Sequence, residues 1–189
     1  MKIYLASHSP RRRMLLSKIG LNFQLIQPNY VEKLDDILKP EEYAKRNAIE
    51  KAKSVLSEIK EGLIIAADTI VVKDNEILEK PKDEEEAVEM LTKLSGNVHF
   101  VYTAVAVVDK NLGKMEVEVE KTTVYMRELG TEEIMRYIQS KEPLDAAGAY
   151  KIQEKGAKFI RRIDGCYSNV VGLPVAILVE ILKKFDIEV

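Results

Sequence analysis

The chain of 189 residues has few of the side chains that make covalent or metal cross-links. It contains one cysteine, Cys166, and two histidines. A single cysteine excludes an internal disulfide and fits a reducing compartment, so a cytoplasmic protein is expected. This set of side chains cannot form a structural zinc site. A metal would have to be held by carboxylates, whose oxygen atoms suit Mg²⁺ or Mn²⁺.

The sequence also lacks an excess of charge and a long apolar run. Its 29 basic and 31 acidic side chains give a formal net charge of −2, and aromatic residues make up 6%. This balance disfavours binding to nucleic acid or to an anionic membrane. No run reaches membrane-spanning length, and the N-terminus has no signal-peptide pattern. With 46% hydrophobic residues the chain can bury a full core, and we expect one soluble domain over 1–189.

Strand and helix patterns alternate irregularly along the chain. We expect strands at 3–6, 22–27, 63–72, 98–108, 116–125 and 159–163, and a loop and strand in 142–153. Helices are expected from Pro10, from Pro40 to Val55, at 83–94, from Thr131 with that residue as cap, and at 175–185. An acidic loop is expected from Pro28 to Pro40. In the helix that follows it, one face is formed by the residues at helical spacing, which are Tyr43, Ala44, Asn47, Ala48, Lys51, Ala52 and Val55. The alternation predicts an α/β fold with a mixed sheet flanked by helices.

The stretch from Ser7 to Arg12 is a candidate polyphosphate site. Ser9 is a good helix N-cap, and Pro10 suits the first helical position. The start of a helix offers backbone N–H groups to an anion, and Arg11 and Arg12 add forked donors that suit phosphate oxygens. An ordinary capped helix with solvated arginines is the alternative, because no Walker-type lysine or glycine-rich loop is present.

Asp68 interrupts the apolar run of residues 63–72. It must face water in a cleft, a metal or a buried cation, because an unpaired carboxylate among apolar neighbours is costly. An interior ion pair with a lysine is the structural alternative to a catalytic role. Together with Glu32, Lys51 and Lys80, Asp68 would form a carboxylate and cation set suited to metal-bound polyphosphate. Each of these residues also has an ordinary structural explanation.

The segment Glu142–Gln153 combines small residues with one amide side chain. Small residues allow close backbone approach, and the Gln153 amide offers both a donor and an acceptor, as pairing with a pyrimidine edge requires. A glutamine on a surface strand is an equally good explanation. His8, His99 and Cys166 have no partner in the pattern, and we assign them no chemistry.

Several motifs, in order along nearly the whole chain, resemble those of the Maf proteins. These are nucleoside triphosphate pyrophosphatases that are also described as septum-formation inhibitors. The motifs are Leu5–Arg12, Ala67–Val71, Lys80-Pro81, Leu94-Ser95-Gly96 with His99, Glu142–Gln153 and Val170–Pro174. The resemblance implies hydrolysis of a nucleoside triphosphate between its α and β phosphates, giving a monophosphate and pyrophosphate, with a divalent cation. It also implies a strongly twisted mixed sheet whose two lobes enclose a deep cleft, often in a homodimer.

The resemblance also implies roles for particular residues. Asp68 would be the proton acceptor that activates water, and Glu32 and Asp68 would hold the metal. The branch that acts on dTTP and UTP carries Asp-Thr at positions 68–69 and Ile-Gln at 152–153. By this carry-over, Arg12, Thr69 and Gln153 would set the selectivity for the base. The residues that would hold the triphosphate are Ser7, Arg11, Arg12, Lys51 and Lys80.

The sequence departs from the family pattern at three positions. Glu79 stands where glycine is usual, Ala146 where lysine is usual, and Glu154 where glycine is common. The missing lysine removes one phosphate contact, which bears on efficiency more than on the reaction. A regulatory protein of cell division that senses nucleotide without turnover is the alternative to an enzyme. The retained Asp68 favours the enzyme, because a sensor has no need of a general base.

Overall fold

The computed structural model describes residues 1–34 and 37–189. Asp35 and Asp36, which belong to the acidic loop expected from Pro28 to Pro40, lie outside the described residues. The strands are β1 (Ile3–Ala6), β2 (Gln24–Ile26), β3 (Leu63–Lys73), β4 (Glu76–Leu78), β5 (Val98–Asp109), β6 (Met115–Met126) and β7 (Ile160–Asp164). The helices are α1 (Pro10–Lys18), α2 (Pro40–Ser54), α3 (Glu84–Leu94), α4 (Thr131–Ile138), α5 (Tyr167–Val171) and α6 (Val175–Lys183). Short 3₁₀ helices cover Leu56–Glu58, Glu142–Asp145, Ala147–Ala149 and Lys155–Phe159. None of the helices within the described ranges is long and apolar enough to cross a membrane.

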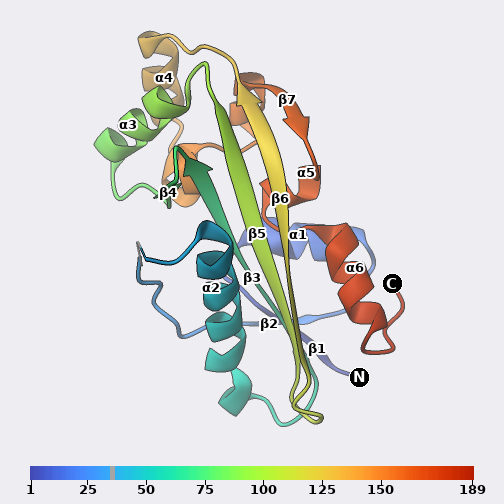
Figure 1. The fold of residues 1–189 in the computed structure, drawn as a ribbon. Coiled ribbons are helices and arrows are strands. Elements are labelled where there is room, and N and C mark those ends of the chain that lie inside the picture. The colour runs from blue at the N-terminus through green and yellow to red at the C-terminus, as the bar shows by residue number, and fades with distance from the viewer. Residues whose placement is uncertain (35–36) are drawn as a thin grey trace. The chain divides into compact units, whose positions relative to one another are not determined.

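Within the described residues, seven strands form one mixed sheet in the order β2-β1-β3-β5-β6-β7, with β4 paired to β3 (Figure 1). β1 runs parallel to β2 and to β3, so that Leu5 lies opposite both Leu25 and Ile65. β4 is antiparallel to β3, and β7 is antiparallel to β6. The α/β class and the mixed sheet predicted from the alternation of elements are confirmed.

The chain divides into two compact units. Unit 1 comprises residues 1–68, 103–120 and 172–189, and unit 2 comprises residues 69–102 and 121–171. The strands β3, β5 and β6 each contain residues of both units.

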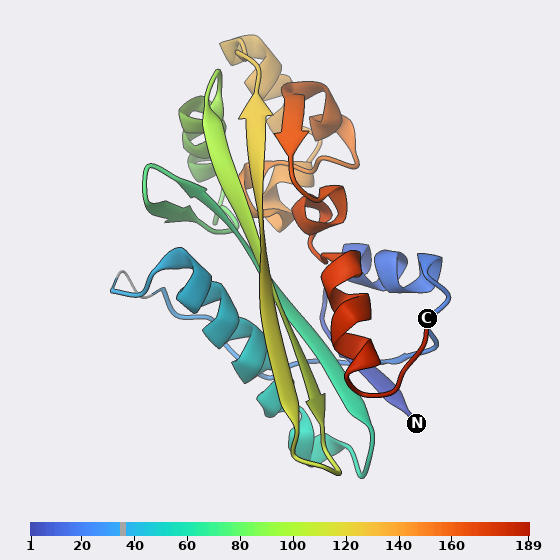
Figure 2. The same cartoon turned by 45° about the vertical axis from the view of Figure 1, so that its right-hand side comes forward.

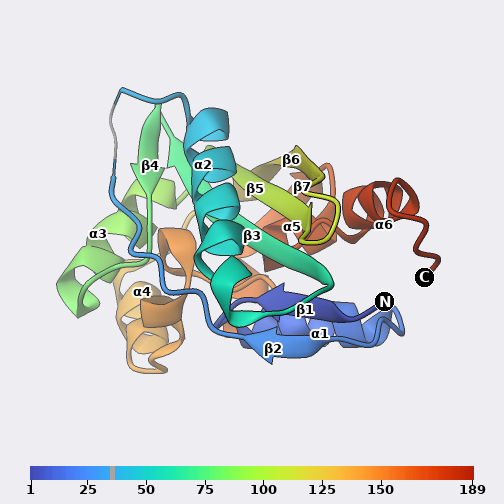
Figure 3. The same ribbon diagram turned by 90° about the horizontal axis from the view of Figure 1, so that it is seen from below.

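In unit 1, helix α2 lies beside β3 (Figure 3). Pro40 occupies the first turn of α2, acidic residues follow it, and basic residues occupy the last turn, as the helix dipole favours. The apolar face that the sequence predicts is buried, and it carries two polar residues, Asn47 and Lys51. Residues 63–67 of β3 are fully buried, as expected for a strand covered on both faces. The polar residues on the inner face of α2 therefore need partners inside unit 1.

The turn between β5 and β6 is tied to the segment that follows α2 (Figure 2). The Lys110 ammonium donates to the carbonyl oxygens of Leu56 and Ile59, at 2.7 and 2.5 Å. The Asn111 side-chain oxygen accepts from the backbone N–H of Gly62 at 3.2 Å. Gly62 has a φ of +118°, and a Cβ there would lie 2.6 Å from the Lys2 carbonyl oxygen, so this position requires glycine.

In unit 2, helices α3 and α4 lie side by side, and the 3₁₀ helices at 142–145 and 147–149 contact α3 (Figure 1). The strand expected within 142–153 is wrong. Lys141 and Gly148 have φ values of 62° and 66°, and Pro143 lies in the first turn of a 3₁₀ helix, so the extended backbone of a strand is interrupted repeatedly. The assignment of Thr131 as the cap of α4 is also wrong, because Gly130 is the N-cap and Thr131 is already helical. Helix α5 was not predicted, since five residues are too few to show a helical period.

Candidate functional site

The turn after β1 has the local structure that the sequence predicts. Ser9 caps α1 by accepting from the backbone N–H of Arg12, and Pro10 begins the helix. The buried Ser7 hydroxyl accepts from the backbone N–H of Ser9 at 3.1 Å and from Arg12 Nη1 at 3.5 Å. Arg12 Nε also donates to the carbonyl oxygen of Gly172 at 2.8 Å. The half-buried Arg12 and Arg11 therefore lie at a helix start whose geometry suits an anion.

Asp68, Lys51 and Glu32 come together in unit 1. Asp68 is 3% exposed, and its Oδ1 accepts from Lys51 Nζ at 2.6 Å. The same ammonium group forms an ion pair with Glu32. The interior ion pair that the sequence left open for Asp68 is therefore present, and it unites three of the residues proposed for the reaction.

Asn47 completes the surroundings of Asp68. Its Nδ2 donates to Asp68 Oδ2 at 3.2 Å, so each oxygen of the carboxylate has one partner on α2. The sequence analysis placed Asn47 on the apolar face of the helix but missed this contact. A signal was available, because Asn47 precedes Lys51 by four residues and so shares its helical face.

The charges of this group favour a cation. Two carboxylates share one ammonium group, which leaves a net charge of −1 next to a buried apolar strand. Among residues 1–34 and 37–189, no three His, Cys, Asp or Glu side chains are placed to hold a metal ion. Mg²⁺ is commonly bound by one or two carboxylates together with substrate phosphates and water. Glu32 and Asp68 therefore offer oxygen ligands of the kind that a divalent cation prefers.

The remaining predicted site residues belong to unit 2. Lys80 Nζ lies 3.2 Å from Asp145 Oδ1, and Lys151 Nζ lies 3.8 Å from Asp145 Oδ2, so one carboxylate is shared by two lysines. The sequence analysis missed Lys151, because the strand expected there gave no indication that its side chain reaches Asp145. Gln153 is half-buried, and its side chain makes no hydrogen bond with another described residue. Thr69 is half-buried in β3.

The segment before Gln153 is held firmly within unit 2. Gly148 donates to the Glu79 carbonyl oxygen at 3.1 Å, and a Cβ at Gly148 would lie 2.9 Å from a Val71 methyl group. The Tyr150 hydroxyl and His99 Nε2 form a buried hydrogen bond of 2.8 Å.

Burial sets the protonation state of this buried pair. It lowers the pKa of His99 to about 4, with a further contribution from the charge of Lys73, and it raises the pKa of the Tyr150 phenol. Both side chains are therefore neutral near pH 7. Their contact anchors the segment that leads to Gln153.

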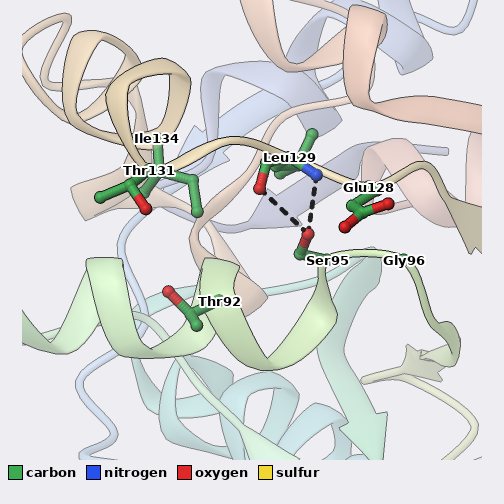
Figure 4. A pocket seen from close by; sticks show the side chains of 7 residues that line it. All are labelled: Thr92, Ser95, Gly96, Glu128, Leu129, Thr131 and Ile134. Carbon is green, nitrogen blue, oxygen red and sulfur yellow. Dashed lines mark hydrogen bonds between the residues drawn. The ribbon is translucent and has the colours of Figure 1, made fainter.

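Unit 2 also contains a pocket of about 390 Å³ between α3 and the start of α4 (Figure 4). The Ser95 hydroxyl lies in its wall, where it accepts from the backbone N–H of Leu129 at 2.7 Å. Among the described residues that line the pocket, Glu128 is the one charged side chain, and none of the predicted site residues is included. The pocket is therefore poorly suited to a polyphosphate.

Comparison with known protein families identifies the family of this chain. The family model described as Maf-like protein matches residues 2–185. The chain therefore belongs to the family of Maf-like proteins.

Several proteins that are similar to this chain over nearly its full length have a more specific name. A protein named dTTP/UTP pyrophosphatase from Carboxydothermus hydrogenoformans is 50% identical over 185 residues, which cover 98% of this chain and 99% of the relative. A protein of the same name from Pelotomaculum thermopropionicum is 46% identical over 188 residues, which cover 100% and 98% of the two chains. A third, from Dictyoglomus turgidum, is 43% identical over 185 residues, with 97% and 96% covered.

Proposed function

We propose that this chain is a nucleoside triphosphate pyrophosphatase that acts on dTTP and UTP, or on modified pyrimidine nucleotides. It hydrolyses them between the α and β phosphates to the monophosphate and pyrophosphate. The observation that carries the proposal is the buried Asp68 carboxylate, held by Lys51 and Asn47 and accompanied by Glu32. The names of the full-length relatives support the same reaction and the same substrates.

Asp68 is the general base in this proposal. Its Oδ1 is bound by Lys51 and its Oδ2 by Asn47, and each carboxylate oxygen keeps a second lone pair. We assign the proton of the attacking water to Oδ2, whose partner is neutral. A divalent cation, Mg²⁺ or Mn²⁺, held by Glu32 and Asp68 would supply charge neutralisation at the phosphates. Lys51 and Asn47 hold the carboxylate in place, so that it can accept the proton.

The remaining candidates bind the substrate. The start of α1, with Ser7, Arg11 and Arg12, would hold phosphate oxygens, and Lys51 and Lys80 would add cations. Arg12, Thr69 and Gln153 would read the pyrimidine base. The proposal includes a nucleotide-binding cleft enclosed by two lobes, a homodimer and a cytoplasmic location.

A product analysis tests the proposed function. Purified protein is incubated with dTTP, UTP, CTP and modified pyrimidine triphosphates, with Mg²⁺ or Mn²⁺, and pyrophosphate and orthophosphate are measured separately. We expect pyrophosphate from dTTP and UTP, and loss of turnover in excess chelator. Asp68→Asn should lower turnover by about 10²–10⁴-fold, with a much smaller effect on nucleotide affinity. Release of orthophosphate alone would contradict the reaction, and nucleotide binding without turnover would favour a sensor.

A further inference from the structure

We propose that Asn47, anchored by Tyr30, is a positioning residue for the Asp68 carboxylate. The inference rests on the proposed function of this site, and it assigns a role to two residues that neither the motifs nor the comparisons single out. All three side chains belong to unit 1.

The hydrogen bonds fix the direction of the Asn47 amide. An ionised carboxylate can only accept, so the contact of 3.2 Å with Asp68 Oδ2 must be made by Asn47 Nδ2 as the donor. The amide oxygen then points the other way and accepts from the Tyr30 hydroxyl, also at 3.2 Å. The acceptor-only carboxylate sets this direction, because a flip would place the amide oxygen against Asp68 Oδ2. The hydrogen bond from Tyr30 then holds the amide at its other end and restricts its rotation.

Burial makes this arrangement costly to leave. Asn47 is fully buried, and Asp68 is 3% exposed. A buried amide that loses its partner gains no water in exchange, so the unsatisfied state is penalised. Tyr30 lies in the loop before α2 and is half-buried. Its hydroxyl is therefore the outermost group of the hydrogen-bonded row Tyr30–Asn47–Asp68.

The amide supplies a constraint that Lys51 alone does not. The terminal torsion of an aspartate is broad, and an ammonium group on a flexible stem accepts many carboxylate orientations. Lys51 binds Oδ1, and the second contact at Oδ2 fixes the plane of the carboxylate. The remaining lone pair of Oδ2, which accepts the proton in the proposed reaction, is thereby aimed in one direction. Partners of this kind typically change activity by about 10- to 100-fold when removed.

Three variants test the inference. Asn47→Leu keeps the approximate size of the side chain and removes the donor, and Tyr30→Phe removes only the hydroxyl. Ala48→Gly is the matched control, because this fully buried neighbour on α2 has no side-chain donor for Asp68, and glycine destabilises a helix. Steady-state hydrolysis of UTP is measured at a temperature at which circular dichroism shows each variant to be folded.

The expected result is a separation of kcat from KM. Asn47→Leu should lower kcat by about 10- to 100-fold and leave KM for UTP within about twofold of the wild type. Tyr30→Phe should lower kcat by about fivefold, as the loss of one hydrogen bond predicts. Ala48→Gly should be less stable than the wild type but retain its kcat. If Asn47→Leu does not fold, the kcat of Tyr30→Phe is compared with that of Ala48→Gly, and this comparison tests the same inference.

Three results would overturn the inference while leaving the proposed function in place. They are an unchanged kcat in both Asn47→Leu and Tyr30→Phe, a rise of KM at constant kcat, and an equal loss of kcat in Ala48→Gly. A wild-type protein without pyrophosphate release would instead overturn the proposed function, and the inference with it.

Discussion

Removal of the Lys51 ammonium should destabilise the protein more than removal of the Asp68 charge. In Lys51→Met, the buried Asp68 carboxylate keeps only the amide of Asn47 as a partner. Breaking a buried ion pair from one side costs about 3–5 kcal/mol, because an uncompensated charge stays behind. In Asp68→Asn, the Lys51 ammonium still pairs with Glu32, whose side chain is 39% exposed. The cost of that variant should be about 1–2 kcal/mol, typical of a lost hydrogen bond.

The difference is large enough to measure. Total stabilities of such domains are about 5–15 kcal/mol, so Lys51→Met removes a substantial fraction. A gap of about 2 kcal/mol corresponds to about 1 M in the urea midpoint. The chain contains no tryptophan, so unfolding is best followed by far-ultraviolet circular dichroism.

The matched control is Lys45→Met on the same helix. Lys45 pairs with Glu41 at the surface, at 2.8 Å, and a pair of this kind contributes about 0.3–0.5 kcal/mol. We expect Lys51→Met to be the least stable variant, Asp68→Asn intermediate, and Lys45→Met close to wild type. Equal losses in Lys51→Met and Asp68→Asn would refute the reasoning. So would a Lys51→Met midpoint as high as that of Lys45→Met.

Three further outcomes are expected. Gln153→Ala should lower kcat/KM for UTP and dTTP more than for CTP, by a factor equivalent to about 1–3 kcal/mol, whereas an equal decline on all three would remove the base-reading role. The pKa of His99 is 6.5 in the unfolded chain and about 4 in the native protein, so between these pH values only the unfolded chain binds the proton. The free energy of unfolding therefore decreases as the pH is lowered through this range. Protonation of His99 in the unfolded chain should lower the free energy of unfolding by about 2 kcal/mol between pH 7 and pH 5. Over the same change of pH, the urea midpoint of His99→Gln should therefore fall less than that of the wild type. Gly62→Ala should destabilise more than Gly113→Ala in thermal unfolding, since both have a positive φ but a Cβ meets a neighbour only at Gly62.

The local periodicity of the sequence predicted the helix and the strand that carry Asn47, Lys51 and Asp68. The helical spacing from Tyr43 to Val55 identified the buried face of α2, and the apolar run before Asp68 identified β3. Periodicity shows which face is buried but not what it contacts. The partner of Asp68 was therefore left open between a lysine, a metal and water, and the contact with Asn47 was missed.

The segment from 142 to 149 shows a different limit. Its left-handed residues and 3₁₀ turns depend on contacts with residues distant in the chain, such as Val71 beside Gly148. Residue composition indicates that such a segment permits close approach, yet it does not specify the backbone path. The shared carboxylate of Asp145 follows from that path and could not be predicted.

The turn between β5 and β6 has a consequence for protein engineering. Hairpin tips are ordinarily the preferred places for peptide tags and inserted domains. Here Lys110 and Asn111 anchor the residues directly after α2, the helix that carries Asn47 and Lys51. An insertion at this tip would loosen the end of that helix, so the site is a poor choice for labelling although it is exposed.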